Sequence, residues 1–132
     1  ETISAAFHHW GPDALHRLRG MFAFCIVDRH TGSAFVARDR FGIKPLFMYE
    51  TRDGVLFASE LKAIRASGLW SQGPNLSRFA YWLAVGRTDA MPESRETFLA
   101  DVGQVLASNV LVAAADTRRW RLAYGGPRWT VR

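Results

Sequence analysis

The sequence predicts an α+β fold in which helices cover antiparallel sheets. Two observations lead to this prediction: a helical opening is followed by two short hairpins, and another helix directly follows the second hairpin. The 132 residues are enough for one hydrophobic core. Hydrophobic residues make up 48% and charged residues 22%, as in ordinary globular proteins, which excludes a disordered or collagen-like chain.

Two helices are predicted at the start of the chain. Apolar residues recur at helical spacing from Glu1 to Trp10, and Gly11-Pro12 ends this first helix. Pro12 suits the first position of a second, short helix, which Gly20 terminates. The two helices are expected to form a helical hairpin.

Four strands in two antiparallel hairpins are predicted next. The first hairpin joins Met21 to Asp28 with Ser33 to Arg38, and its first strand is so continuously apolar that we expect it to be buried. The second hairpin joins Pro45 to Glu50 with Val55 to Ala58 around the tight-turn pair Asp53-Gly54.

Two more helices and a last hairpin complete the predicted elements. Ser59 is expected to cap a helix that ends before Gly68. The other predicted elements are a helix from Asn75 or Ser77 to Gly86, a loop from Arg87 to Arg95, strands from Asn109 to Ala115 and from Trp120 to Tyr124, and an end of order at Gly125 to Pro127.

Composition argues against several functional classes. The net charge of +5 comes from arginines scattered from Arg17 to Arg132, so nucleic-acid binding is not expected. The apolar run from Met21 to Val27 is too short to cross a bilayer. The single cysteine, Cys25, allows no internal disulfide, and we expect a cytoplasmic protein. Because residue 1 is Glu1 and not methionine, an internal piece of a longer protein is expected.

Three phrases carry a resemblance to a known family. They are LRGMFAFCIVD (Leu18 to Asp28), ARDRFGIKPLFMY (Ala37 to Tyr49) and FASELKAI (Phe57 to Ile64). In this order and at this close spacing they resemble the class II glutamine amidotransferase domain of glutamine-hydrolysing asparagine synthetases. The resemblance runs from Glu1 to about Ser67 and continues more weakly beyond.

The resemblance implies part of an N-terminal-nucleophile hydrolase sandwich, truncated at its N-terminal side, with two antiparallel sheets between helices. Residues 1–70 would form the C-terminal part of the amidotransferase domain, and residues 71–132 the segment leading toward the synthetase domain. At Val105 to Ser108 the chain lacks the Leu-Pro-Pro-Gly turn usual in the family, which leaves the geometry of this loop open.

The implied parent enzyme makes asparagine. It would hydrolyse glutamine to supply ammonia for the amidation of aspartate or a related carboxylate, with ATP and Mg²⁺, and a homodimer is one arrangement open to it. The class II nucleophile is an N-terminal cysteine, whereas residue 1 here is glutamate. The sequence also contains no pyrophosphate loop of the Ser-Gly-Gly-x-Asp-Ser type. We therefore expect these residues alone to be inactive and to need no cofactor.

Seven motif positions are the candidate site residues, and no catalytic or metal-binding residue is assigned. Two interpretations stay open: they form a wall supporting the glutamine pocket and the ammonia exit, or they form a polar corner that braces the two hairpins. For the last two positions the alternative role is capping of the helix that follows. The seven are Arg38, Asp39, Gly42, Lys44, Pro45, Ser59 and Glu60.

Other reactive side chains are given structural interpretations. The apolar neighbours of Cys25 predict a buried thiol with a raised pKa, unsuited to catalysis. Thr2 would become a terminal nucleophile if residue 1 were removed, but its expected helical position argues against this role. His9 and His16 straddle Gly11-Pro12 and share no helical face, so the histidines are read as surface residues and not as metal ligands.

Two rival functions remain. One is an amidophosphoribosyltransferase-type amidotransferase, although Lys44 and the run Glu60 to Ile64 favour the synthetase. The other is a noncatalytic scaffold or interaction domain. In either case, unpaired strand edges and abundant aromatic residues predict association or poor solubility of the isolated chain.

Overall fold

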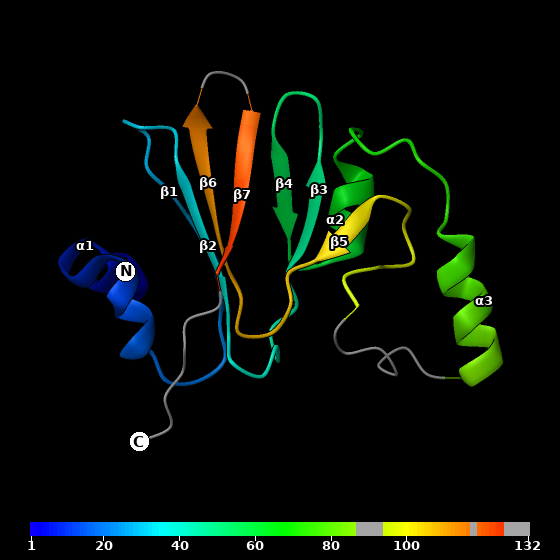
Figure 1. Ribbon diagram of the computed structural model, residues 1–132, viewed down its shortest axis with the longest axis horizontal. Helices are drawn as coiled ribbons and strands as arrows, with labels where there is room; N and C mark the ends of the chain where they lie inside the picture. Colours follow the sequence, from blue (N-terminus) through cyan, green and yellow to red (C-terminus); the bar gives the residue numbers. More distant parts are fainter. Residues whose placement is uncertain (87–93, 117–118, 126–132) are drawn as a thin grey trace.

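The computed structural model describes residues 1–86, 94–116 and 119–125, which form the helices and strands in Figure 1. In chain order these are α1 (Thr2–Trp10), the 3₁₀ helix η1 (Gly11–His16), β1 (Ala23–Val27), β2 (Ala34–Arg38), β3 (Phe47–Glu50), β4 (Val55–Ala58), α2 (Leu61–Ala66), α3 (Leu76–Val85), β5 (Val102–Gln104), β6 (Val110–Asp116) and β7 (Arg119–Gly125).

The strands form two antiparallel sheets. Sheet A has the order β1-β2-β6-β7, and sheet B has the order β4-β3-β5. The predicted α+β class and its three hairpins are thus confirmed. The strands that follow residue 70 complete both sheets, since β5 pairs with β3 and β6 pairs with β2.

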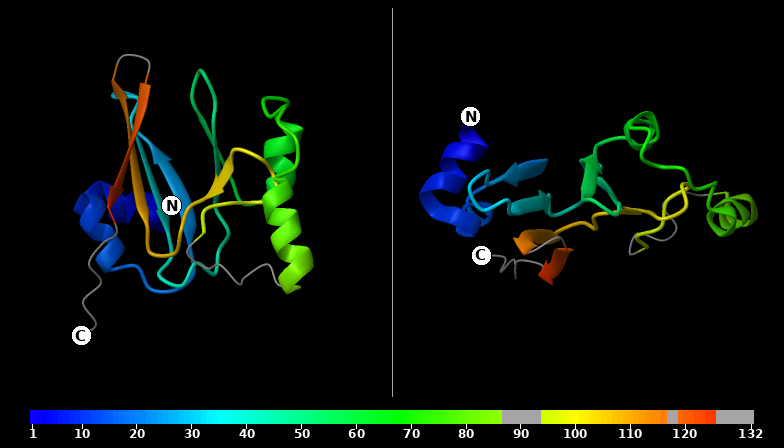
Figure 2. Two further views of the ribbon diagram at one scale, coloured as in Figure 1. Left: turned by 45° about the vertical axis from the view of Figure 1, so that its right-hand side comes forward. Right: turned by 90° about the horizontal axis from the view of Figure 1, so that it is seen from above.

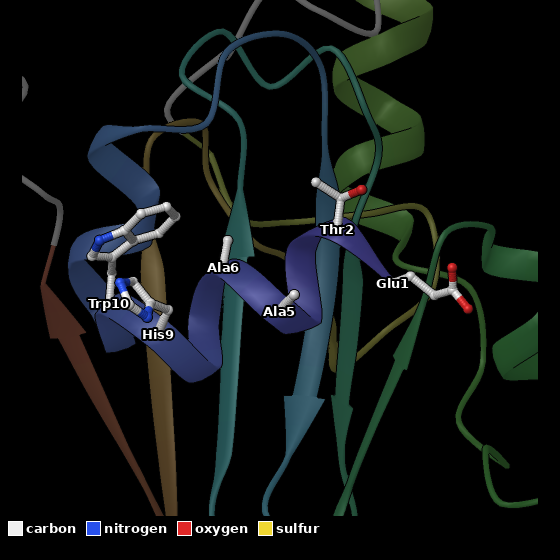
Figure 3. Close-up of a pocket in the computed structure, with 6 residues that line it drawn as sticks. All are labelled: Glu1, Thr2, Ala5, Ala6, His9 and Trp10. Carbon is white, nitrogen blue, oxygen red and sulfur yellow. The ribbon is translucent and has the colours of Figure 1, made fainter.

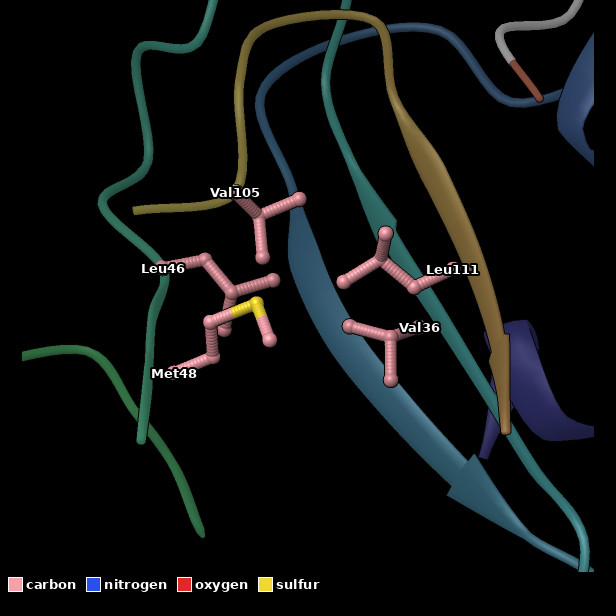
Figure 4. Close-up of a cluster of buried hydrophobic side chains, with 5 residues drawn as sticks. All are labelled: Val36, Leu46, Met48, Val105 and Leu111. Carbon is pink, nitrogen blue, oxygen red and sulfur yellow. The ribbon is translucent and has the colours of Figure 1, made fainter. Parts of the chain in front are cut away.

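The two sheets face each other and carry helices on their outer sides (Figure 2). Between the sheets lies a core cluster of five buried side chains, to which sheet A contributes Val36 and Leu111 (Figure 4). Leu15 of η1 packs with Phe35 and Ala37 on the outer face of sheet A, and Ile64 of α2 packs with Tyr49 on the outer face of sheet B.

The predicted helices are found with two corrections. The second helix is a short 3₁₀ segment that ends at His16, well before Gly20. The prediction that Ser59 caps α2 is wrong, because Glu60 is the N-cap residue and α2 has no side-chain cap hydrogen bond. α3 is as predicted: the Asn75 side chain accepts from the Arg78 amide, and Gly86 ends the helix with a left-handed backbone (φ 72).

Two features of the strands differ from the sequence-based prediction. β1 is an edge strand of sheet A, and Cys25 is exposed on it, so the prediction of a buried thiol is wrong. β5 was not predicted, because three residues that include Gly103 show no strand pattern. Residues 87–93 of the predicted loop after α3 lie outside the part of the chain that the structure describes. The same holds for the predicted end of order from residue 126.

Exposed apolar residues concentrate on α3. Leu76 is 73% exposed and Leu83 is 74% exposed, whereas the rings of Phe79 and Trp82 contact Phe98. Association of the isolated chain stays a prediction, and this helix is one surface that supports it. Among the described helices, none has the length and apolar character that crossing a membrane requires.

Candidate functional site

The candidate residues gather at one end of the two sheets. β2 ends at Arg38, the chain then crosses to sheet B through Asp39 to Leu46, and β3 starts at Phe47. Because Phe47 pairs with Ala58, the residues that follow β4 lie at the same end of sheet B. This end is the lower one in Figure 1. We call residues 38–45 the corner.

Asp39 holds the corner together through its buried carboxylate, which is 1% exposed. Oδ1 accepts hydrogen bonds from the amides of Phe41 (3.1 Å) and Ile43 (3.0 Å), and Oδ2 accepts from the Lys44 amide (2.9 Å). Burial alone would raise the pKa of Asp39, but these amides and that of Phe22 outweigh it and lower the pKa. The carboxylate is therefore held in its charged form.

Arg38 crosslinks the corner to the second sheet. Its guanidinium donates from Nε to the Lys44 carbonyl (2.8 Å) and from Nη2 to the Gly42 carbonyl (2.7 Å). Nη1 donates to the carbonyl of Val105, which follows β5. Burial lowers the pKa of Arg38 and the charge of Asp39 opposes this, but an arginine side chain stays charged in proteins.

Gly42 allows the corner to turn tightly. Its φ of 64 lies in the left-handed region, which most residues avoid. A Cβ added here would also lie 3.0 Å from the Cβ of Ala107 and 3.3 Å from the Arg38 guanidinium carbon. The glycine therefore meets both a backbone and a space requirement.

We predict that Gly42→Ala lowers the free energy of unfolding by about 2 kcal/mol, since the left-handed backbone alone costs about 1–2 kcal/mol. Denaturant melts of the wild type and the variant give the value. The matched change is Gly42→Ala with Ala107→Gly, which removes the close contact but not the backbone strain. It should recover part of the loss, and no recovery would contradict the proposed contact.

The other four candidate residues are exposed, and the structure does not bring their side chains into the network of Arg38 and Asp39. Lys44 contributes its backbone amide and carbonyl. Pro45 leads into β3, and Ser59 follows β4. The Glu60 carboxylate pairs with Lys62 (2.5 Å), and this hydrogen bond raises the pKa of Lys62.

The loop from Val105 to Ser108 is hydrogen-bonded to the corner, although it was not among the candidate residues. Ser108 donates its amide to the Asp39 carbonyl (2.9 Å) and has a positive φ of 61. This is the segment where the resemblance places the family's Leu-Pro-Pro-Gly turn. That alignment was the one signal in the sequence that could have linked the loop to Arg38 and Asp39.

The remaining reactive side chains lie away from the corner. Partial burial raises the pKa of the Cys25 thiol in the predicted direction, although the residue itself is exposed. Thr2 lies in the first turn of α1, as expected. In the part of the chain that the structure describes, no three His, Cys, Asp or Glu side chains are grouped to hold a metal ion.

A separate hollow lies on the outer side of α1 (Figure 3). It is open, measures about 500 Å³, and carries no candidate catalytic pair. Its lining residues are Glu1, Thr2, Ala5, Ala6, His9 and Trp10.

The fold and the corner define an α+β domain whose two facing sheets are linked at one end by the part-buried guanidinium of Arg38, next to the buried carboxylate of Asp39. Residues 1–124 match the model of the glutamine amidotransferase domain family. The chain belongs to this family.

Curated relatives share long stretches of the sequence. A putative glutamine-hydrolysing asparagine synthetase of Mycobacterium tuberculosis is 53% identical over 64 residues, which cover 48% of this chain and 10% of the relative. Asparagine synthetase 1 of Bacillus subtilis is 44% identical over 64 residues, with the same coverage. Amidase chyE of Penicillium rubens is 29% identical over 129 residues, or 94% of this chain and 18% of the relative. The chain thus spans a small part of each relative's length.

Proposed function

We propose that these residues form part of the glutamine-hydrolysing unit of a glutamine-dependent asparagine synthetase. In this role they help to release ammonia from glutamine for the amidation of aspartate or a related carboxylate. The observation that supports the proposal most is the corner: within the motif that carries the resemblance, from Arg38 to Pro45, the Arg38 guanidinium and the buried Asp39 carboxylate are hydrogen-bonded to backbone groups of the motif and of Val105.

The architecture supports the same proposal. Two antiparallel sheets facing each other, with α1 and α2 on their outer sides, fit the N-terminal-nucleophile hydrolase sandwich. In this scheme Arg38 and Asp39 are positioning residues, since both side chains are engaged with backbone groups. They set the spacing of the two sheets and the path of residues 40–44, and those residues form a wall of the glutamine pocket.

We place the protein in the cytoplasm.

ATP and Mg²⁺ do not fit the described residues of this chain. The donor set for Mg²⁺ would be carboxylates, and no suitable group of them is assembled among these residues. The sequence also contains no Gly-rich pyrophosphate loop. We therefore assign no step of nucleotide chemistry to this chain and place the use of ATP elsewhere in the parent enzyme.

The identity of the acceptor has a second candidate. The match to the Penicillium amidase extends over 94% of this chain, which is a longer alignment than those with the two asparagine synthetases named above. The name of this relative gives no acceptor, so a carboxylate related to aspartate stays open as the acceptor. Glutamine hydrolysis is common to both versions of the proposal.

A chimera tests the proposal directly. The 64-residue segment of the Bacillus subtilis asparagine synthetase that matches this chain is replaced by the residues found here. We expect the chimera to release glutamate from glutamine and to make asparagine from either glutamine or free ammonia. A chimera that uses ammonia but not glutamine would contradict the proposal, because its synthetase half would be intact. Asp39→Ala in the chimera is the control for the corner.

We also predict that Cys25 takes no part in glutamine hydrolysis. Its raised pKa leaves little thiolate at neutral pH, and it lies on an edge strand, outside residues 38–45. In the chimera, Cys25→Ala should leave the rate of glutamate release within about twofold of the unchanged chimera. A loss of a hundredfold or more, of the size expected for a nucleophile, would show that the thiol is catalytic.

A further inference from the structure

The turn that joins β3 to β4 presents the pair Asp53-Gly54 to solvent. It lies at the end of sheet B opposite the corner, since β3 begins next to the corner and ends at Glu50 (Figure 1). Asp53 is exposed, and among the described residues no hydrogen bond or ion pair holds its carboxylate. The carboxylates of Asp28 and Asp39 differ, because each accepts several hydrogen bonds. The carboxyl group of Asp53 is thus free to move.

Thr51 holds one side of this turn and leaves the other side open. Its amide (2.8 Å) and its hydroxyl (2.9 Å) both donate to the Gly54 carbonyl, and its hydroxyl oxygen accepts from the Asp53 amide (3.3 Å). Many tight turns are also closed by a bond from the amide of the fourth residue to the carbonyl of the first. Within the described part of the chain, Gly54 makes no such bond to Thr51, and its amide has no other acceptor. A free amide therefore directly follows an unrestrained carboxyl group.

A carboxyl group and the amide that follows it react with each other when they come close. In the protonated form of Asp53, the Gly54 nitrogen attacks Cγ and gives up its proton, and the carboxyl hydroxyl takes a proton and leaves as water. The product is a succinimide ring, and water then adds to either of its carbonyls. Cleavage at Cγ restores aspartate, whereas cleavage at the main-chain carbonyl gives isoaspartate. Water leaves and water enters, so no other reactant is needed.

We propose that Asp53 is a site of spontaneous isoaspartate formation in the folded protein, at a rate that the hold of Thr51 on the turn limits. Isoaspartate carries the chain through Cβ and Cγ, so the backbone between Thr51 and Gly54 becomes longer. Because β4 is an edge strand of sheet B, the turn rearranges without breaking the pairing of a further strand. The corner lies at the other end of the sheet, so this reaction does not depend on the proposed function.

Three variants separate this reaction from general decay of the chain. Asp53→Glu should lose the product, since the longer side chain would have to close a larger ring. Gly54→Ala should slow the reaction, because the added Cβ obstructs the attack and narrows the range of backbone angles. Thr51→Val keeps the shape of the side chain but removes its hydroxyl. It should speed the reaction about fivefold, the factor that corresponds to the loss of one net hydrogen bond.

Ageing of the purified chain in heavy-oxygen water tests the proposal, at neutral pH and below the melting temperature, with circular dichroism to check that the chain stays folded. Peptide mass spectrometry locates the heavy oxygen that ring opening leaves. Methyl transfer from radioactive S-adenosylmethionine by a protein isoaspartate methyltransferase measures the product. We expect both signals at Asp53 and neither at Asp28 in the same digest.

The free peptide of residues 48–58 is the reference for the unrestrained reaction. The proposal is overturned when this peptide takes up heavy oxygen and the folded chain does not. It is also overturned by a product that persists in Asp53→Glu, or by a rate in Thr51→Val that is no higher than that of the wild type.

Discussion

Replacement of Asp39 by alanine is expected to lower the free energy of unfolding by about 3–5 kcal/mol, since hydrogen bonds to a charged group contribute about 1.5–3 kcal/mol each. The change leaves the amides of Phe41, Ile43 and Lys44 without their carboxylate acceptor. It also leaves the part-buried guanidinium of Arg38 without the nearby negative charge. Urea or guanidinium melts followed by circular dichroism measure the loss, and a variant that does not fold marks its upper limit.

Asp28 provides the matched control for Asp39. Its carboxylate also accepts hydrogen bonds in a turn, from the His30 amide (2.8 Å) and the Thr31 hydroxyl (2.9 Å), but it is exposed. Water replaces these bonds when the side chain is removed, so Asp28→Ala should cost less than about 1 kcal/mol. Equal losses in the two variants would show that burial of the corner contributes nothing.

The lowered pKa of Asp39 also predicts how stability depends on pH. A carboxyl group whose pKa is lower in the folded state stabilises the fold above its unfolded pKa of about 3.9. This stabilisation is lost as the pH falls below that value and through the lower folded pKa. In Asp39→Asn the group no longer titrates, so stability should fall less steeply below about pH 4. An unchanged slope between pH 4 and the acid transition would exclude Asp39 as a source of acid sensitivity.

Local sequence signals predicted the elements well but not how they combine. The Asp53-Gly54 turn and the apolar runs beside it predicted the β3–β4 hairpin, which the structure confirms. The edge position of β1 could not be predicted, because an apolar run looks the same whether a strand lies at the edge or the centre of a sheet. β5 is short and contains a glycine, so the sequence shows no strand pattern there. It becomes a strand because it pairs with β3.

The corner was predicted in part. A polar corner that braces the two hairpins was one of the two interpretations of these positions, and in the structure Asp39 accepts amide hydrogen bonds and Gly42 has a positive φ. The role of Val105 and Ser108 did not follow, because they come from a loop more than sixty positions further along the chain. Contacts between segments this distant depend on the whole fold. The bracing interpretation has direct support in these bonds, and the role in a glutamine pocket stays a proposal.

Leu111→Ala is the second change for which a large loss is expected, since leucine-to-alanine changes in cores cost about 2–5 kcal/mol. Leu111 is 1% exposed and packs between the sheets with Val36 and Val105, so its removal leaves a cavity where sheet A meets sheet B (Figure 4). Its neighbour Val112 is 40% exposed on the other side of β6, so Val112→Ala should cost less than about 1 kcal/mol. Denaturant melts compare the two variants directly.

Because Leu111 belongs to β6, which follows residue 70, a large loss at Leu111 alone would show that the late strands are part of the same cooperative unit as the early hairpins. Small and equal losses would mean that sheet A and sheet B are not held together by this core.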